Sequence, residues 1–176
     1  MRRREEDAAI VGQQSPFQTI DHGEAIYALR FAPNGTTIAA GDNSGNVDFW
    51  DADSGRQLAQ TIAGGGGAVA SVSFDPAGRR LMTTSSDGNI RLWDLTDDKL
   101  IGVPLSGGSG FGWGTFYPDG HHLIVVYPSG TGIVWDADPA SWSAQACRVA
   151  RRNLTRAEWR EFLPQRPYRR VCAAAG

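Results

Sequence analysis

Residues 85–94 of this chain read Ser85-Ser86-Asp87-Gly88-Asn89-Ile90-Arg91-Leu92-Trp93-Asp94. The first half is a polar turn, and the second half is a short strand pattern that ends in Trp-Asp. The same pattern occurs at residues 46–51 and 131–136, so that Trp50, Trp93 and Trp135 lie 43 and 42 residues apart. A Phe-x-Pro-x-Gly motif (residues 31–35, 74–78 and 116–120) begins 19 residues before each of these tryptophans. The chain therefore contains an internal repeat with a fixed register.

A period in the low forties with Trp-Asp at the end of a strand is typical of a four-stranded propeller blade. On these anchors the stretch from Asp21 to Asp136 resembles the WD-repeat (WD40) family. The resemblance implies a β-propeller fold and a role as a platform for other macromolecules. The predicted fold class is all-β: a partial β-propeller of three four-stranded antiparallel blades, the last lacking its outer strand, with a C-terminal two-helix extension.

Alternating apolar and polar residues around each Pro and Gly turn predict the strands of the blades. They fall at residues 25–31, 37–40 and 47–50, at 69–74, 81–85 and 89–93, and at 112–116, 123–127 and 131–135. Outer strands are expected at residues 15–20, 56–62 and 99–105, and glycine runs at 64–67 and 107–110 are expected as flexible connectors. The predicted domains are an N-terminal remnant (1–14), blades (15–136, with repeats at about 21–62, 63–105 and 106–136) and a basic helical extension (137–176).

Three blades are too few for a closed ring, which needs at least about four. The first expectation is that this sequence is the C-terminal part of a longer multi-blade protein. The second is that two copies associate, with residues 15–20 of one chain serving as the fourth strand of the other's third blade. An open array is the third possibility.

The pattern changes after Asp136, because Asp138 is a good N-cap and Pro139 suits a first helical turn. Thr155 and Glu158 form a capping-box pattern that predicts a second helix before Pro164. Residues 146–164, with 168–172, resemble the C-terminal extension of bacterial WD-repeat proteins whose upstream part is a STAND-class signalling ATPase. No ATPase motif occurs here, so nucleotide hydrolysis would belong to another part of such a protein.

Charge is divided unevenly along the chain. Residues 1–147 hold 17 acidic and 9 basic residues, whereas residues 148–176 hold 8 arginines against Glu158 and Glu161. The arginines could contact nucleic-acid phosphates, lie against the acidic blades, or form the solvated faces of two helices. Lys99 is the single lysine, a bias that we associate with a GC-rich bacterial genome.

The chain has two cysteines, Cys147 and Cys172, which are too few for a zinc site. They form either one disulfide or two reduced thiols, and a cytosolic location favours the thiols. Neither a signal peptide nor a run of about 18 apolar residues is present, so a cytoplasmic location is expected.

The resemblance implies a hydrogen-bonded set of His, Ser or Thr, Asp and Trp within each blade, and no repeat here has the complete set. Residues expected as structural repeat anchors are Trp50, Asp51, Asp87, Trp93, Asp94, Trp135, Asp136 and His22. Residues expected to contact a partner through the blade loops are Asp42, Asn43, Ser44, Asn46, Ser86 and Asn89.

Residues 42–48 place oxygen ligands on alternate positions, but they lack the distal Glu of a calcium loop, and a polar hairpin turn explains them equally well. No metal site, cofactor or catalytic residue is therefore expected, and the chain is not expected to be an enzyme. The predicted function is a non-catalytic scaffold for protein–protein interaction or ligand sensing, in the regulatory C-terminal part of a larger bacterial signalling protein. The alternative is a nucleic-acid-binding module that acts through the arginine-rich tail.

Overall fold

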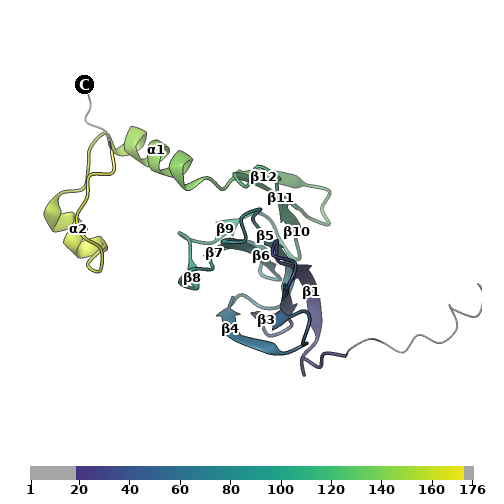
Figure 1. Cartoon of the computed structure of the whole chain (residues 1–176). Helices are drawn as coiled ribbons and strands as arrows, with labels where there is room; N and C mark the ends of the chain where they lie inside the picture. Colours follow the sequence, from purple (N-terminus) through teal and green to yellow (C-terminus); the bar gives the residue numbers. More distant parts are fainter. Residues whose placement is uncertain (1–18, 173–176) are drawn as a thin grey trace, which may run out of the picture.

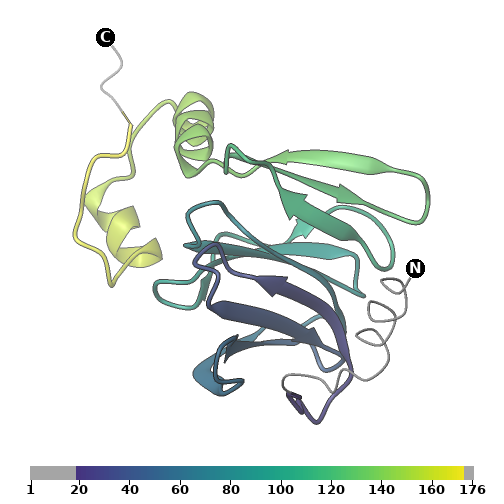
Figure 2. The same cartoon turned by 45° about the vertical axis from the view of Figure 1, so that its right-hand side comes forward.

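The computed structural model describes residues 19–172, in which three antiparallel sheets follow one another along the chain (Figure 1). The N-terminal remnant and most of the strand expected at residues 15–20 lie outside the described residues. The sheets succeed one another like sectors of a fan, as the turned view also shows (Figure 2). This arrangement confirms the predicted partial β-propeller.

The first sheet follows from the first repeat. Its strands are β1 (Ile26–Phe31), β2 (Thr37–Asp42), β3 (Asn46–Asp51) and β4 (Gln57–Ala63), in that order. The β1–β2 turn closes because the side-chain oxygen of Asn34 accepts hydrogen bonds from the backbone N–H groups of Thr36 and Thr37. Gly35 completes that turn with a φ of 73°, a conformation that glycine adopts without strain.

The second sheet repeats this order with a divided outer strand. It contains β5 (Val69–Phe74), β6 (Arg80–Ser85), β7 (Asn89–Asp94), β8 (Lys99–Leu100) and β9 (Leu105–Ser106). Both β8 and β9 pair with β7. The single outer strand predicted at residues 99–105 is therefore two short strands, since Gly102, with a φ of 74°, and Pro104 interrupt the extended backbone between them.

The third sheet has three strands: β10 (Trp113–Phe116), β11 (His122–Val126) and β12 (Gly132–Asp136). β12 pairs with β11 along one edge and has no strand along its other edge among the described residues. The outer strand is absent because a helix begins where β4 and β8 occur in the other blades, as the sequence predicts.

Apolar side chains fill the two spaces between the sheets. The cluster between the first and second sheets includes Val47, Phe49, Val72 and Leu81. The cluster between the second and third sheets includes Met82, Leu92, Leu123 and Val125. The first strands are the ones that meet across these spaces, because β5 contacts both β1 and β10. Burying each large side chain contributes roughly 1.5–3 kcal/mol, so these two clusters provide most of the stability of the blades.

Polar contacts fix the third blade on the second. Ser71 donates from its hydroxyl to the carbonyl of Gly114 at 3.0 Å. Arg80 forms an ion pair with Asp75 at 3.1 Å within its own blade. The same guanidinium donates to the carbonyl oxygens of Ala137, at 2.6 Å, and Gly120. One arginine thus joins two loops of the third blade to the second.

The C-terminal extension consists of α1 (Pro139–Ala150) and α2 (Arg156–Phe162), followed by a segment without regular structure. Asp138 caps α1, and Thr155 and Glu158 form a capping box on α2, as predicted. Neither helix is long and apolar enough to cross a membrane.

The apolar side chains of these two helices are only partly buried. Trp142 packs against the third blade and donates from its indole N–H to the carbonyl of Asp136 at 2.9 Å. Val149 of α1 and Phe162 of α2 are instead 75% and 65% exposed. The reason is that no sheet or third helix of the described chain covers these sides of α1 and α2.

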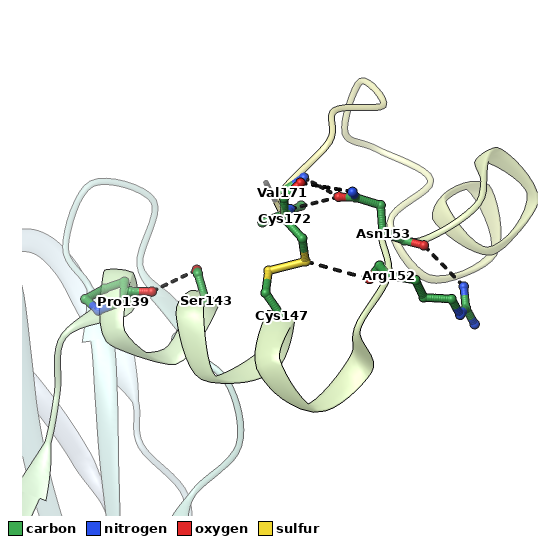
Figure 3. Close-up of a disulfide and its surroundings, with 7 residues drawn as sticks. All are labelled: Pro139, Ser143, Cys147, Arg152, Asn153, Val171 and Cys172. Carbon is green, nitrogen blue, oxygen red and sulfur yellow. Dashed lines mark hydrogen bonds between the residues drawn. A yellow bond between two sulfur atoms is a disulfide. The ribbon is translucent and has the colours of Figure 1, made fainter. Parts of the chain in front are cut away.

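A disulfide joins Cys147 of α1 to Cys172, and their Cα atoms are 5.4 Å apart (Figure 3). The structure therefore has the disulfide and not the reduced pair favoured for a cytosolic protein. The 25-residue separation makes the whole second helix part of one covalent loop.

Candidate protein-interaction surfaces

The β2–β3 turn of the first blade carries four of the residues predicted to contact a partner. Asp42 is only 2% exposed, and its carboxylate accepts from the backbone N–H of Asn46 at 2.7 Å and from the Asn46 amide at 3.2 Å. Asp42 and Asn46 therefore shape the turn from within. Asn43 and Ser44 are exposed at its tip and can reach another molecule.

The β6–β7 turn of the second blade is built in the same way around Asp87. Burial raises the pKa of Asp87, but hydrogen bonds from Arg91 and Asn89 outweigh it and hold that pKa below its usual value. The Arg91 guanidinium lies 2.7 Å from the Asp87 carboxylate. Asp87 is exposed at the tip, whereas Ser86 and Asn89 are half-buried beside it.

A glycine loop (Gly64–Gly67) joins these two turns into one rim. Gly64 donates its N–H to the carbonyl of Gly45 at 2.8 Å, and Asp87 donates its N–H to the carbonyl of Gly66 at 3.2 Å. A side chain at Gly66 would clash with the Asp87 carboxylate. The loop predicted as a flexible connector is thus a close-packed spacer. It holds Asn43 and Ser44 on the same rim as Ser86 and Asn89.

The Trp residues of the repeats are wholly or partly buried in the blades. Trp50 and Trp93 are 8% and 7% exposed, and the Trp93 indole N–H donates to the Thr83 hydroxyl at 3.0 Å. Trp135 is half-buried, and its indole nitrogen is buried without a hydrogen-bond partner among residues 19–172. The reason lies in the register, because Val125 occupies in the third blade the position of Thr83 in the second.

The aspartates that follow these tryptophans cap the next turns. The Asp51 carboxylate accepts from the N–H and hydroxyl of Ser54, and Asp94 accepts from the N–H of Thr96 at 2.9 Å. In the third blade, Asp136 accepts from the Ser141 hydroxyl and from the N–H of Asp138. These hydrogen bonds lower the pKa of all three carboxyl groups. The three aspartates therefore stay charged at the ends of β3, β7 and β12.

His22 lies against the first blade in a contact that the sequence did not predict. Its Nε2 is 2.9 Å from the carboxylate of Asp48, while the other Asp48 oxygen accepts from Thr61 at 2.6 Å. The His22 ring centroid lies 6.0 Å from that of Trp50, so two of the predicted repeat anchors lie close together in the first blade. The sequence signal that could have indicated this contact is Asp48. It lies 43 residues before Arg91, so the first repeat has an acidic residue where the second has a basic one.

Among the residues that the structure describes, one group of three potential metal ligands lies close together: His22, Asp42 and Asp48. Their ligand atoms lie within 4.8 Å of one another. Asp42 uses both oxygens within its turn, and Asp48 uses both on His22 and Thr61. Both carboxylates of the group are thus engaged within the first blade, whereas Nδ1 of His22 is buried without a hydrogen-bond partner among the described residues.

The two outer faces of the three-sheet stack are apolar and exposed. Leu29 and Phe31 of the first blade are 49% and 57% exposed, whereas Val72, one repeat after Leu29, is 1% exposed. Val134 of the third blade is 53% exposed, whereas Leu92, one repeat before it, is 3% exposed. The same positions that bury apolar side chains between blades therefore present them to the surroundings at both ends of the stack.

Comparisons with known proteins agree with the blade architecture. The family model described as WD domain, G-beta repeat matches residues 14–51 and 56–94. A solved structure titled "Structure of U3-55K" resembles this chain with a TM-score of 0.59 and 19% sequence identity, over 66% of this chain and 37% of that one. The chain thus spans about a third of that structure's length, and at this identity the likeness shows the fold alone. A search of curated proteins found no match.

Proposed function

This chain belongs to the WD40-repeat family, and from that premise we propose that it is a non-catalytic scaffold for other proteins within a larger propeller. WD40 repeats in general mediate protein–protein interaction. The observation that carries the proposal is the exposed apolar face at each end of the stack, with Leu29 and Phe31 at one end and Val134 at the other. Exposed apolar patches of this kind mark surfaces that another protein element covers.

The elements that fit these faces best are further blades. Val72 and Leu92 are buried because a neighbouring sheet covers them, so a sheet of the same kind would cover Leu29 and Val134 in the same way. The free edge of β12 offers an additional place where an outer strand could pair. The blades would come from a longer chain or from a second copy of this one.

Light scattering after size exclusion tests this completion. The chain alone should self-associate as its concentration rises, and Leu29→Asp together with Val134→Asp should return it to a monomer with unchanged circular dichroism. Thr36→Asp with Ser129→Asp adds the same charge at exposed turns and should leave the association unchanged. A wild-type chain that stays monomeric and well folded at all concentrations contradicts the proposal.

Partner proteins would contact the rim formed by the two turns and the glycine loop. Its tips are polar, exposed at Asn43, Ser44 and Asp87, and held by hydrogen bonds behind them, so contact would disturb no core residue. Asn43→Arg with Ser44→Arg should abolish cross-linking to a partner in cells, whereas Thr36→Arg at the opposite end of β2 should not. Loss of the cross-link with Thr36→Arg alone would place the contact elsewhere.

We also place this scaffold in the regulatory C-terminal part of a bacterial signalling protein. Support comes from the resemblance of residues 146–172 to the extensions of such proteins. An antibody raised against the extension should detect, in cells, a band well above the 18.9 kDa of this sequence. Binding of nucleic acid through the arginines is the alternative, and binding to DNA or RNA that falls steeply with salt would favour it.

A cytoplasmic location would keep Cys147 and Cys172 reduced. The redox state of these two cysteines in the cell therefore indicates the compartment in which the protein lies. Thiol alkylation in intact cells, followed by mass spectrometry, should label both cysteines if the protein is cytoplasmic. It should label neither if the bond forms in its own compartment.

A further inference from the structure

The C-terminal module (residues 139–172) carries a positive charge that its own residues barely neutralise. All eight arginines of the tail lie between the two bonded cysteines. Within the described part of the tail, the one ion pair joins Arg152 to Glu158 at 2.7 Å. The guanidinium groups of Arg166 and Arg169 have no ion pair or hydrogen bond in that part of the chain. They are therefore free to bind an anion.

Two hollows open on this module, on either side of Leu154 and Val171. The first has a volume of about 370 Å³ and is lined by Leu154, Trp159, Leu163, Arg166, Pro167, Arg169 and Val171. The second has a volume of about 310 Å³, and its lining includes Ala146, Ala150, Arg152, Leu154 and Val171. Both have an apolar floor, and arginines stand on the rim of the first. Such a surface suits a segment that has apolar and anionic groups together.

The floor of the first hollow is rigid. Trp159 is 4% exposed, and its indole N–H donates to the carbonyl of Arg166 at 2.8 Å. The ring of Tyr168 packs edge-on against it, with centroids 5.5 Å apart. The indole is therefore held inside the module and offers no open face on which a base could stack.

The two walls of the hollows are fastened to each other. The side-chain oxygen of Asn153 accepts from the N–H groups of Val171 and Cys172, both at 2.8 Å, and its amide donates to the carbonyl of Cys172 at 3.0 Å (Figure 3). The disulfide closes the same junction from the side of α1. A site held in this way loses little conformational entropy when it binds, which favours affinity.

We propose that these two hollows bind an acidic segment of a partner protein that carries large apolar side chains. The apolar side chains would enter the hollows beside Leu154 and Val171, and carboxylates would pair with Arg166 and Arg169. Guanidinium and carboxylate groups match in a planar, two-bond geometry. A nucleic acid would supply anions but no aliphatic side chain for the floor, and the floor has no free aromatic face for a base. The site is independent of the blades, because none of its lining residues belongs to a sheet.

Fluorescence anisotropy with synthetic peptides on the full chain tests this site. The probe is a glutamate-rich peptide that contains two leucines. One comparison peptide has serine in place of leucine, and a second has glutamine in place of glutamate. DNA oligonucleotides, single-stranded and duplex, are measured at the same ionic strength. The leucine peptide should bind more tightly than all of these, by about tenfold or more.

Variants separate the site from the overall charge. Arg166→Gln with Arg169→Gln should weaken binding of the leucine peptide by about tenfold. Arg151→Gln with Arg160→Gln removes the same charge outside both hollows and should change the affinity less than about twofold. Val171→Gln places a polar side chain in the lining of both hollows at unchanged net charge, and should also weaken binding of the leucine peptide. Unchanged helical circular dichroism shows that each variant is folded.

Three results would overturn the proposal. Equal affinity for the leucine and serine peptides would mean that the hollows are not used. Equal losses with the two arginine pairs would mean that only the total charge matters. Tighter binding of an oligonucleotide than of the leucine peptide would assign the module to nucleic acid.

Discussion

The blades and the C-terminal module are stabilised by different contacts. Between the sheets, Leu81, Met82 and Leu123 are fully buried, and hydrogen bonds between blades such as that from Ser71 to Gly114 only supplement this packing. In the module, Trp159 is the buried residue of α2, and α1 has none. The module relies on a disulfide, two helix caps and the three hydrogen bonds of Asn153.

This difference shows how a short segment can hold a shape without a core of its own. About 34 residues cannot bury enough apolar surface to offset their conformational entropy. A covalent bond and satisfied polar groups replace the missing core. The blades instead repeat one packing unit, so that each sheet depends on its neighbour. Perturbing one region should accordingly leave the other largely intact.

The largest expected effect is in the blades. Leu81→Ala removes a side chain that is 0% exposed in the cluster between the first two sheets, and should lower the free energy of unfolding by about 4 kcal/mol. Urea denaturation followed by tryptophan fluorescence measures this change. Leu29→Ala, on the open face, should cost less than about 1 kcal/mol. An equal cost at both positions would show that the open face is covered in solution.

The next effect is in the module. Reduction of the disulfide, or Cys147→Ser with Cys172→Ser, should destabilise the module by about 3 kcal/mol, because the closed loop spans 25 residues. Amide hydrogen exchange should rise throughout α2 and stay unchanged in β5 and β6. Faster exchange in the blades as well would mean that the two regions are energetically coupled.

A smaller effect separates the second blade from the third. Thr83→Val leaves the buried indole N–H of Trp93 without its acceptor and should cost about 1–2 kcal/mol. Val125→Thr places a hydroxyl where the unpaired indole N–H of Trp135 can reach it, and should recover up to about 1 kcal/mol. Thermal unfolding of both variants measures the difference. Stabilisation by Thr83→Val would contradict the role assigned to this hydrogen bond.

The smallest effect is the pH response of the module. The side chain of Arg152, and then the backbone N–H of Thr155, lower the pKa of Glu158 from its usual 4.5 to about 2. Because the folded-state pKa is depressed, its stabilising contribution is complete above about pH 4.5 and is lost as the pH falls through about 2. Carboxyl NMR titration measures this pKa, and Arg152→Gln should raise it. An unchanged pKa in that variant would refute the ion pair.

The repeat register predicted most of the fold because the same sequence signals mark the strands in every repeat. Two signals recur at fixed spacing: the turn at Pro33 and Gly35, and the strand end at Trp50. An ambiguous strand assignment in one repeat can therefore be settled from the equivalent residues of the next repeat. The helix caps at Asp138 and Thr155 were equally readable, since capping depends on neighbouring residues. The sequence analysis missed the interruption of the outer strand at Gly102. This strand consists of two short pieces, β8 and β9, and each of them pairs with β7.

Contacts between distant residues could not be predicted in the same way. Asp42 looked like a surface residue of a polar turn, yet it is buried because its carboxylate binds Asn46 on the inner side. The pairing of His22 with Asp48 and the bridge from Arg80 to the third blade depend on how neighbouring strands pack. The bond between the cysteines depends on how α1 and the terminal segment meet, which spacing alone does not determine.

The disulfide has a practical consequence for anyone who handles this protein. Every arginine of the tail, from Arg148 to Arg170, lies between Cys147 and Cys172. A single trypsin cut after any of these arginines, except Arg166, which precedes Pro167, therefore leaves both fragments tied to each other. Such a nicked protein migrates as one intact band on a gel without reductant, and the cleavage becomes visible only after the sulfurs are separated.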